Sequence, residues 1–494
     1  MGTPRFQAVM NDSDEVIWTI ERDPALRTTI TAIALLDRSP DMARLEERLR
    51  SGARLIPRLH QRVVEPPFRL GPPRWVSVGE PDLGYHLRHV VAPPPATLRT
   101  VLDMAATLAM AGFDRSRPLW EFTVVDGLAD GRAALIQKVH HSFTDGVGGI
   151  RLAMMLLDVS RDADAAAAGE VDGDLTAESV SPMGLAIDGL AGRAREALAF
   201  ARATARISSG AARRVVTDPP GAARDAVRTA TSIAKILAPA TARQSPVFRG
   251  VSLQWRFDSI ELPLATLRAA GKQAGGTVND AFLAAVTAGL RRYHLRHGAP
   301  VDGLRVDMPI SYRVGDDDLG GNRFVPARFT VPVGTPLDPI ERMRTLGALA
   351  RSWRNEPALP LTDTLAGLLN RLPPIVTTSV FASMLKGVDF VATNVPGAPF
   401  PVYLAGAEVV AEYAFAPPSG AAVNVSLISH VGTACIGVLS DRVAVPDGEL
   451  FLECLREGFD EVVAVVPTKP VRTRPHRPKP AAATPANGKV GAAS

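Results

Sequence analysis

The stretch His140-His141-Ser142-Phe143-Thr144-Asp145-Gly146 constrains this chain more than any other part of its sequence. The residues before it, 133–139, are apolar and typical of a buried strand, whereas residues 150–157 have the pattern of an apolar helix. Two histidines and an acid therefore mark a place where a strand ends and a helix begins. Because rigid elements aim side chains into clefts at such junctions, the stretch indicates a functional site in a mixed α/β chain.

Each histidine of this pair could be a structural residue, a metal ligand or a general base. Adjacent strand residues point to opposite faces, and no Cys or Glu at ligand spacing completes a metal site, so we expect no metal. An imidazole changes protonation near neutral pH, which suits a general base. On strand alternation His141 shares a face with Leu135, Gln137 and Val139, and His140 points to the other face. Only one of the two can therefore be the base.

Other short motifs accompany this stretch, and each has a simpler structural explanation beside a functional one. Thr277 and Asp280 form a capping box at the start of a predicted helix over 278–295, which leaves Asn279 as a possible site residue. Pro118, Leu119 and Trp120 are expected to pack a core, and Asn322 follows two glycines in a loop. The motifs are Pro118-Leu119-Trp120-Glu121, Thr277-Val278-Asn279-Asp280, Gly321-Asn322-Arg323-Phe324, Asn394-Val395-Pro396-Gly397 and Pro401-Val402-Tyr403-Leu404-Ala405-Gly406.

The order and spacing of these motifs resemble the bacterial wax ester synthase/diacylglycerol acyltransferase family. The His-His stretch by itself is similar to the signature of the chloramphenicol-acetyltransferase-like, CoA-dependent acyltransferase superfamily. The resemblance runs from about residue 40 to about residue 465. The N-terminal stretch from Asp14 to Trp18 matches the family's Asp-x-x-Phe pattern only loosely, which bears on substrate preference more than on the reaction.

This resemblance implies a mixed α+β fold of two pseudo-symmetric chloramphenicol-acetyltransferase-like domains, with the active site at their interface. It makes His141 the general base beside His140, and Asp145, followed by Gly146, the residue that holds the loop. The implied substrates are acyl-CoA and the hydroxyl of a diacylglycerol or long-chain alcohol, and the products are triacylglycerol or wax ester. No cofactor is implied. Direct transfer is expected, because the chain has no Gly-x-Ser-x-Gly elbow and neither cysteine has a His nearby in the sequence.

Two alternatives remain open. The acyl group could come from a carrier-protein thioester, as in polyketide-associated transferases and condensation domains, although no carrier domain is fused to this chain. The chain could also be a catalytically silent lipid-binding protein that keeps the fold. The intact His-His stretch argues against the second alternative, because a degenerate copy is expected to lose His141 before Gly146.

The length and composition are those of a globular chain. With 494 residues, of which 46% are hydrophobic and 21% charged, it can bury two substantial cores. Cys435 lies in a strand-like run and Cys454 in a helical one, and both are expected as buried thiols. The polar N-terminus does not resemble a signal peptide, and no apolar run approaches the ~18 residues of a membrane span. We expect a cytoplasmic protein, peripherally associated with membrane or lipid inclusions.

The charge is unevenly distributed along the chain. The formal net charge is +4, but the tail 467–494 carries six basic residues and no acid, which leaves 49 basic against 51 acidic residues elsewhere. Residues 191–250 carry eleven Lys or Arg against three acids and are predicted to form a basic amphipathic helix pair, broken at Pro219-Pro220. This segment is either a solvated linker or a contact with anionic lipid surfaces. Nucleic-acid binding is not expected, because aromatic residues are only 5% of the chain.

The sequence predicts four parts. Residues 1–158 form an N-terminal acyltransferase half, residues 159–250 an Ala/Arg-rich helical linker, and residues 251–466 a C-terminal half. The Pro- and Ala-rich tail, 467–494, is expected to be disordered, since its composition cannot build a core.

Overall fold

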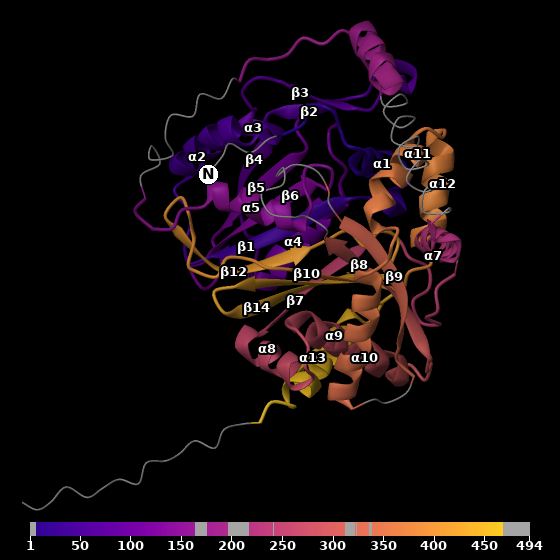
Figure 1. Cartoon of the computed structure of the whole chain (residues 1–494). Helices are drawn as coiled ribbons and strands as arrows, with labels where there is room; N and C mark the ends of the chain where they lie inside the picture. Colours follow the sequence, from indigo (N-terminus) through magenta and orange to yellow (C-terminus); the bar gives the residue numbers. More distant parts are fainter. Residues whose placement is uncertain are drawn as a thin grey trace, which may run out of the picture.

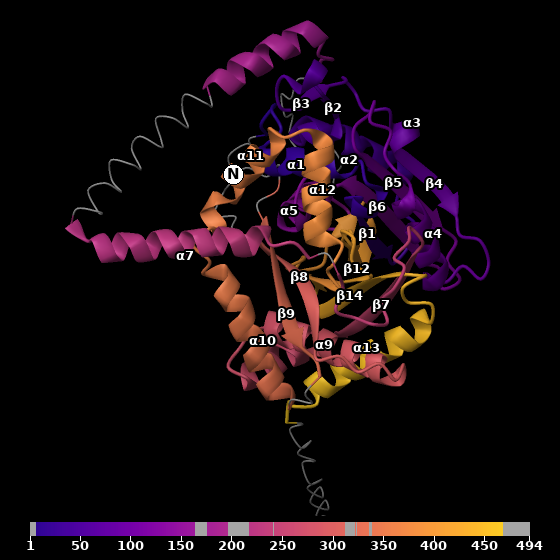
Figure 2. The same cartoon turned by 90° about the vertical axis from the view of Figure 1, so that its right-hand side faces the viewer.

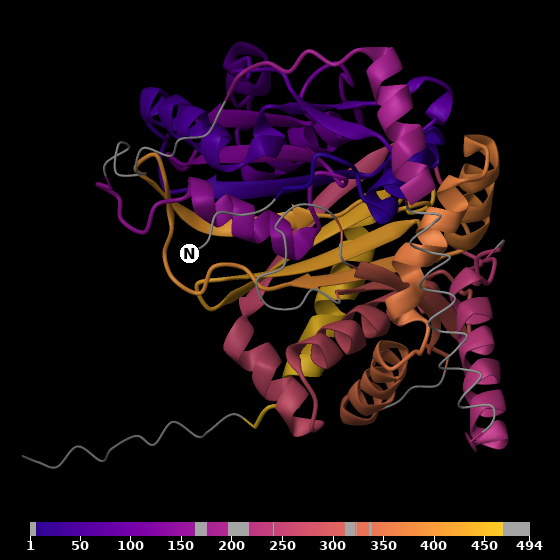
Figure 3. The same ribbon diagram turned by 45° about the horizontal axis from the view of Figure 1, so that its top comes forward.

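The structure is a computed structural model, and it describes residues 6–163, 175–195, 217–240, 242–311, 322, 324–334 and 338–467. Two six-stranded sheets lie one above the other, and helices cover their outer faces (Figure 1). Seen from above, the indigo and magenta N-terminal half stacks on the orange and yellow C-terminal half (Figure 3). The predicted mixed α/β fold is therefore confirmed.

The first sheet contains the strand of the His-His stretch near its centre. Its strand order is β11-β12-β1-β6-β5-β4, in which only β4 and β5 run parallel. Helices α2 (Met42–Leu55) and α5 (Gly146–Leu156) cover one face, and the short helix α3 (Leu83–His86) precedes β4. The strands are β1 (Thr29–Leu36), β4 (Leu87–Val91), β5 (Trp120–Asp126), β6 (Ala133–His140), β11 (Tyr403–Leu404) and β12 (Ala407–Phe415).

Two strands of this first sheet come from the C-terminal part of the chain. β12 pairs antiparallel with β1, and β11 extends the edge, so residues 403–415 belong to the first sheet and not to a self-contained half 251–466. Ala411, Tyr413 and Phe415 of β12 are buried in the core between the two sheets, whereas Ala407 and Val409 pack on the other face of the first sheet. This exchange of strands joins the two halves.

The second sheet has the strand order β7-β14-β13-β10-β8-β9. Helices α8 (Leu264–Gln273), α9 (Val278–Arg296), α10 (Pro339–Arg354) and α13 (Gly448–Val463) cover its lower face in Figure 1. β7 runs from Trp255 to Pro263 and pairs with β14 over its whole length. The strands are β7 (Trp255–Pro263), β8 (Gly303–Ser311), β9 (Phe324–Pro332), β10 (Phe390–Val395), β13 (Val423–His430) and β14 (Thr433–Asp441).

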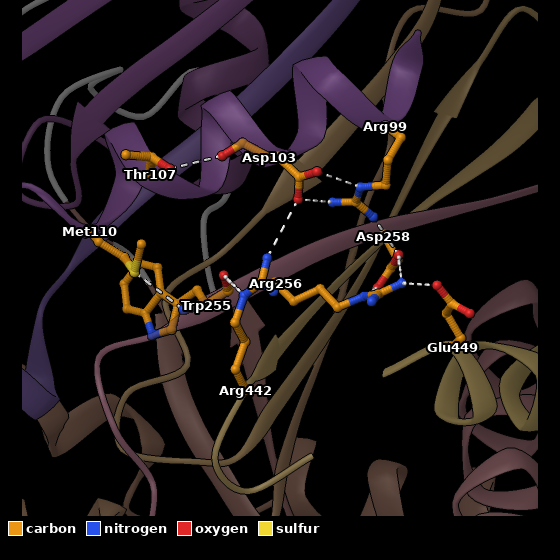
Figure 4. A network of polar contacts seen from close by, with 9 residues as sticks. All are labelled: Arg99, Asp103, Thr107, Met110, Trp255, Arg256, Asp258, Arg442 and Glu449. Atoms are coloured by element: carbon orange, nitrogen blue, oxygen red, sulfur yellow. Dashed lines mark hydrogen bonds and ion pairs between the residues drawn. The ribbon is translucent and has the colours of Figure 1, made fainter. Parts of the chain in front are cut away.

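Helix α4 (Leu98–Met110) lies between the sheets and links them through polar contacts (Figure 4). Arg99 on α4 donates to Asp258 on β7 at 2.7 Å and pairs with Asp103 on its own helix at 2.8 Å. Arg256 donates to the same Asp258 at 2.7 Å, and Arg442 reaches Asp103 at 3.5 Å. Residues from both halves thus share carboxylates, and these ion pairs hold α4 against the second sheet.

A third group of helices packs beside the two sheets. α1 (Asp12–Ile20) contacts α11 (Thr362–Asn370) and α12 (Pro374–Leu385), while α7 (Pro219–Leu237) projects away from the body (Figure 2). A two-stranded sheet of β2 (Gln61–Val64) and β3 (Arg74–Ser77) lies nearby. Single turns of 3-10 helix lie at Pro24–Leu26, Pro57–Leu59, Pro67–Arg69 and Leu359–Leu361.

The predicted helix pair in the basic segment is seen in part. Residues 182–195 form a helix, and α7 begins at Pro219 with Asp218 as its N-cap. Residues 196–216 between them, and 468–494 of the tail, lie outside the described residues. Cys435 on β14 and Cys454 on α13 are both buried and free, as the sequence predicts.

Candidate active site

The His-His stretch forms the connection between β6 and α5. β6 ends at His140, and the backbone N–H of His141 donates to the carbonyl of Thr28, beside β1, at 2.9 Å. α5 begins at Gly146, directly after Asp145. The predicted junction of strand and helix is therefore confirmed, and His141 is held at the end of a central strand.

The ring of His141 is bound to a residue from the other half of the chain. Nδ1 of His141 lies 2.8 Å from Oδ1 of Asn322, and Nδ2 of Asn322 donates to the carbonyl oxygen of His141 at 2.7 Å. The side chain of Asn322 is buried. One residue thus contacts both the ring and the backbone of His141, which restricts the orientation of the imidazole.

The orientation of the Asn322 amide follows from a third residue. Nδ2 of Asn322 also donates to Oδ1 of Asp14 at 2.6 Å, and the backbone N–H of Asn322 donates to the same oxygen at 3.0 Å. Nδ2 donates to two acceptors, the carboxyl of Asp14 and the carbonyl oxygen of His141, so the remaining amide atom, Oδ1, is the one that contacts the His141 ring. An amide oxygen can only accept, so Nδ1 of His141 carries the proton and Nε2 is the unprotonated ring nitrogen.

Burial shifts the pKa values of both His141 and Asp14. Burial lowers the pKa of His141 and outweighs its own carbonyl oxygen, Asp145 and Asn322, which act in the opposite direction. Burial also raises the pKa of Asp14 to about 7, although its hydrogen bonds to Asn322 and the charge of Arg58 oppose the rise. A lowered pKa keeps the His141 ring neutral at physiological pH, which is the state that a general base requires.

His140 lies in a separate environment on the opposite face of β6. Its Nδ1 accepts from the backbone N–H of Ser142 at 3.1 Å, and Nε2 lies 3.2 Å from Oγ1 of Thr28 and 3.1 Å from a carboxylate oxygen of Glu21. Burial alone would raise the pKa of Glu21, but His140 and the N–H of Thr28 hold it well below its usual range. With only 1% of its surface exposed, His140 is enclosed by protein on every side.

Asp145 and Gly146 shape the start of α5. Asp145 is the N-cap, and its Oδ1 accepts from the backbone N–H of Gly148 at 2.8 Å. A Cβ on Gly146 would stand 2.9 Å from Cγ2 of Val395, the residue of the Asn394–Gly397 motif that ends β10. The absence of a side chain at Gly146 therefore lets the second sheet approach the His-His loop.

An apolar cavity extends from this loop along the first sheet. It has a volume of about 130 Å³ and lies on the face of β6 that carries Gln137 and Val139, which is the face predicted for His141. β10 and β13 close the cavity at the interface between the halves, with Val395 and Ile428. Its other apolar lining includes Ile30, Ala32, Phe122, Phe143, Leu152 and Leu156. The cavity therefore adjoins the loop that contains His141.

The remaining candidate residues occupy packing and capping positions, and the carbonyl of Leu119 accepts from the backbone N–H of His140 at 3.1 Å. Leu119 and Trp120 are fully buried in core clusters, and Pro118 precedes them, which agrees with the packing explanation. The capping box of Thr277 and Asp280 is confirmed at the start of α9. There the Asn279 amide lies 3.8 Å from the Met308 sulfur, within the helix-covered layer of the second sheet. Gly321 and Arg323 lie outside the described residues.

Sequence reasoning missed one member of the site. Asp14 was considered only as part of a loosely matching N-terminal stretch, yet it anchors Asn322 and thereby His141. Asp14 is buried on α1, among hydrophobic residues such as Val16 and Trp18. A carboxylate on the apolar side of a short helix is the signal that could have identified it, because a buried acid needs a specific partner.

None of the helices in the described part of the chain combines the length and apolar character that crossing a bilayer requires. Within the described ranges, no group of three or more His, Cys, Asp or Glu side chains is placed to hold a metal ion.

Comparison with solved structures relates this fold to known acyltransferases. The chain is similar to the wax ester synthase/diacylglycerol acyltransferase of Marinobacter aquaeolei VT8, with a TM-score of 0.61 and 21% identity over 93% of this chain and 100% of the other. It is also similar to the first condensation domain of the calcium-dependent antibiotic synthetase, with a TM-score of 0.59 and 14% identity over 94% and 97% of the two chains. At these identities the likeness shows the fold.

Comparison of sequences shows the family. The profile of the wax ester synthase/diacylglycerol acyltransferase catalytic domain matches residues 10–282, and the profile of the family's C-terminal domain matches residues 320–462. A Mycobacterium tuberculosis H37Rv protein named as a diacylglycerol O-acyltransferase is 37% identical over 94% of this chain and 93% of its own length. A second one from that strain, tgs1, is 27% identical over 92% and 95%. The chain therefore belongs to the wax ester synthase/diacylglycerol acyltransferase family and is an O-acyltransferase.

Proposed function

We propose that this protein transfers the acyl group of an acyl-CoA directly to the hydroxyl of a diacylglycerol or a long-chain alcohol, with His141 as the general base. The observation that carries the proposal is the hydrogen bond that Nδ1 of His141 donates to Oδ1 of Asn322, which makes Nε2 the basic nitrogen of the ring. The apolar cavity beside His141 supports a lipid substrate. No cofactor is needed, because the bonds that form and break all belong to the two substrates.

The reaction begins with the acceptor hydroxyl hydrogen-bonded to Nε2 of His141. Nε2 takes the proton while the acceptor oxygen forms a bond to the thioester carbonyl carbon, which gives a tetrahedral oxyanion. The C–S bond then breaks, and the leaving thiolate takes the proton back from the imidazolium. The products are an ester and free CoA, and His141 returns to its neutral form. General-base assistance of this kind contributes roughly 10²–10⁴-fold to the rate.

Neither cysteine is suited to carry the acyl group. Burial raises the pKa of Cys435 to about 11, and burial also raises the pKa of Cys454. A thiol with a raised pKa is a poor nucleophile at neutral pH, since only the thiolate attacks. These values support a direct transfer between two bound substrates, in which their alignment supplies much of the rate.

The proposal is tested with purified protein and an acyl-CoA labelled in its acyl group. Offered a diacylglycerol and a long-chain alcohol in turn, the protein should form a labelled ester, which thin-layer chromatography separates. Without an acceptor, the denatured protein should carry no label. A stable labelled adduct on Cys435, Cys454 or a serine would contradict direct transfer. A requirement for acyl-carrier protein in place of acyl-CoA would instead favour the carrier-thioester route.

We also propose that the protein associates peripherally with anionic membrane or lipid-inclusion surfaces through its basic segment. The helix over 182–195 exposes Met183, Ile187 and Leu190, which recur at helical spacing on one face. The first turns of α7 are exposed and carry Arg224 and Arg228. Apolar side chains next to cations suit the boundary between headgroups and acyl chains.

Vesicle binding tests this second proposal. Binding to anionic vesicles should weaken as salt rises, because the Debye length shortens from ~10 Å at 0.1 M to ~3 Å at 1 M. A chain ending at Val466 serves as the control for the basic tail, since each basic residue near such a surface contributes ~1 kcal/mol. Binding that disappears with the tail would contradict the proposal. Binding that survives truncation but is lost on replacing Arg202, Arg206, Arg213 and Arg214 by Gln would support it; these four arginines lie outside the described residues.

A further inference from the structure

The apolar cavity beside the His-His loop contains a polar constriction. A second cavity of about 30 Å³ adjoins it, deeper under α2 and α5. The two cavities share five lining residues, namely Phe122, Gln137, Ala153, Leu156 and Glu412. A carboxyl and an amide therefore stand where the larger cavity meets the smaller one. The other polar lining residues are Arg48 in the smaller cavity, which pairs with Asp158, and Thr144 and Asp145 at the loop end of the larger cavity.

The strand register brings Gln137 and Glu412 to the same face of the sheet. β1 runs between β6 and β12, and Ala32 pairs with Gln137 while Ala34 pairs with Glu412. A β-bulge in β12, where Leu35 pairs with Ala411 but Leu36 pairs with Val409, reverses the alternation of β12. Because Ala32 and Ala34 have small side chains, they leave open space between the two polar groups.

Glu412 lacks the partner that a buried carboxyl usually has. Among the described residues, no hydrogen bond or ion pair to the carboxyl of Glu412 or to the side-chain amide of Gln137 is found. Burial alone raises the pKa of Glu412 to about 7. A hydrophobic residue at this position would line the cavity without the free-energy cost of an unpaired polar group. The cost would be offset if a ligand supplies the missing hydrogen bond.

We propose that Gln137 and Glu412 form a subsite for a hydroxyl group on the lipid chain that occupies the cavity. A hydroxyl can donate to the carboxylate of Glu412 and accept from the amide of Gln137, so it can satisfy both side chains. This subsite rests on the proposed function, since the chain must enter the cavity with its reacting end at His141. It makes the enzyme selective for oxygenated chains over plain hydrocarbon chains.

The geometry gives the position of that hydroxyl. Four strand positions separate Gln137 from His141, which corresponds to about 13 Å at ~3.3 Å per residue. An extended hydrocarbon chain with ~1.5 Å bonds advances about 1.3 Å per carbon, so roughly ten carbons span this distance. The subsite therefore selects a chain with a hydroxyl near its middle, and a hydroxyl on the third carbon would lie too close to His141 to reach it.

A competition experiment tests the subsite. The full-length protein is given equal amounts of octadecanoyl-CoA and of the same thioester with a hydroxyl on about the tenth carbon. One plain alcohol serves as the acceptor. Mass spectrometry measures the ratio of the two ester products, which equals the ratio of kcat/KM for the two thioesters. A second arm keeps the plain acyl-CoA and compares a plain long-chain alcohol with a diol of the same length. The arm in which the hydroxylated compound is preferred shows whether the acyl-CoA or the alcohol places its chain in the cavity. The preference expected from one such hydrogen-bonded group is roughly tenfold.

Variants connect any preference to the two side chains. Glu412→Leu and Gln137→Leu should abolish the preference for the hydroxylated chain, measured within each variant as the ratio of kcat/KM for the two acyl-CoAs. The matched control is Glu408→Leu, because Glu408 lies on the same strand but pairs with Arg161 at 3.2 Å, away from the cavity. A hydroxyl on the third carbon of the acyl chain should bring no preference in any variant.

The outcomes separate this subsite from the proposed function. A wild-type protein that esterifies plain chains but shows no preference in either arm overturns the subsite and leaves the function intact. A preference that persists in both Glu412→Leu and Gln137→Leu also overturns it. No ester with any acyl-CoA contradicts the proposed function instead. Thermal melting of each variant establishes that it is folded, and Glu412→Leu is expected to melt no lower than the wild type, since it removes a buried unpaired acid.

Discussion

Oδ1 of Asn322 lies 2.8 Å from Nδ1 of His141, although 181 residues separate the two in the chain. The amide of Asn322 is held in turn by Asp14 on α1. A general base is effective when a neighbouring group fixes its tautomer and orientation, and here an asparagine anchored by a buried acid occupies that place. The site thus combines residues from the N-terminal helix, the central strand of the first sheet, and a loop of the second half.

Replacing Asn322 tests its role as a positioning residue. Asn322→Ala removes the acceptor for Nδ1 of His141, so the ring can rotate and take the other tautomer. We expect kcat to fall by roughly 10–10²-fold, within the range that proton transfer contributes, while KM changes little. Asn279→Ala is the matched control, because Asn279 contacts Met308 in the helical layer, and it should stay close to wild-type kcat. Equal losses in both variants would point to a merely structural effect.

The two adjacent histidines should respond differently to alanine. His141→Ala removes the proton acceptor and is expected to lower kcat by roughly 10²–10⁴-fold with little change in melting temperature. His140→Ala removes one hydrogen-bond partner of half-buried Glu21 and one of buried Ser142, so we expect a clear loss of thermal stability and a smaller loss of activity. Similar kinetics for the two variants would refute the assignment of His141 as the base.

The pH dependence of kcat/KM reports the protonation of His141 in the free enzyme. Burial lowers the pKa of His141 from its ordinary value of 6.5, so the neutral ring persists as the pH falls through 6.5. The acid limb of the profile should therefore have its midpoint below pH 6.5. A midpoint at or above 6.5 would mean that the charge of Asp145 and the hydrogen bonds outweigh burial at this site.

The close approach of Gly146 and Val395 predicts a compensating pair of mutations. Gly146→Ala places a methyl group 2.9 Å from Cγ2 of Val395, closer than carbon atoms normally approach, so one element must shift. We expect Gly146→Ala to lower both melting temperature and activity. Val395→Ala in the same chain should restore a substantial part of both, and a double-mutant cycle measures the coupling. Additive losses would show that the two residues do not meet.

Asp145 is expected to act through the start of α5. Asp145→Ala removes the N-cap and should cost about 1 kcal/mol of stability, whereas Asp145→Asn keeps a good capping residue and should cost less. Thermal melting and kcat of both variants are compared with wild type. If Asp145→Asn melts like the wild type but loses activity as severely as His141→Ala, a direct chemical role for the carboxylate follows.

Local patterns in the sequence were sufficient for the elements that carry the site. The apolar run before the two histidines and the apolar helix after them predicted β6 and α5, because each pattern has the period of its own element. The same alternation placed His141 on the face of Gln137 and Val139, where the cavity lies. The capping box at Thr277 and Asp280 was predictable as well, since its hydrogen bonds join residues three positions apart.

Contacts between distant residues were decided by tertiary structure. Alternation along 407–415 would place Glu412 with Glu408 on a solvent-facing side, but the bulge at Leu35–Leu36 and the cover of α5 place it inside the cavity. The pairing of β12 with β1, and of Asn322 with His141 and Asp14, depends on how the two sheets stack. A periodic pattern fixes only which face of an element is buried. Which distant residue meets that face is determined by the packing of the whole chain.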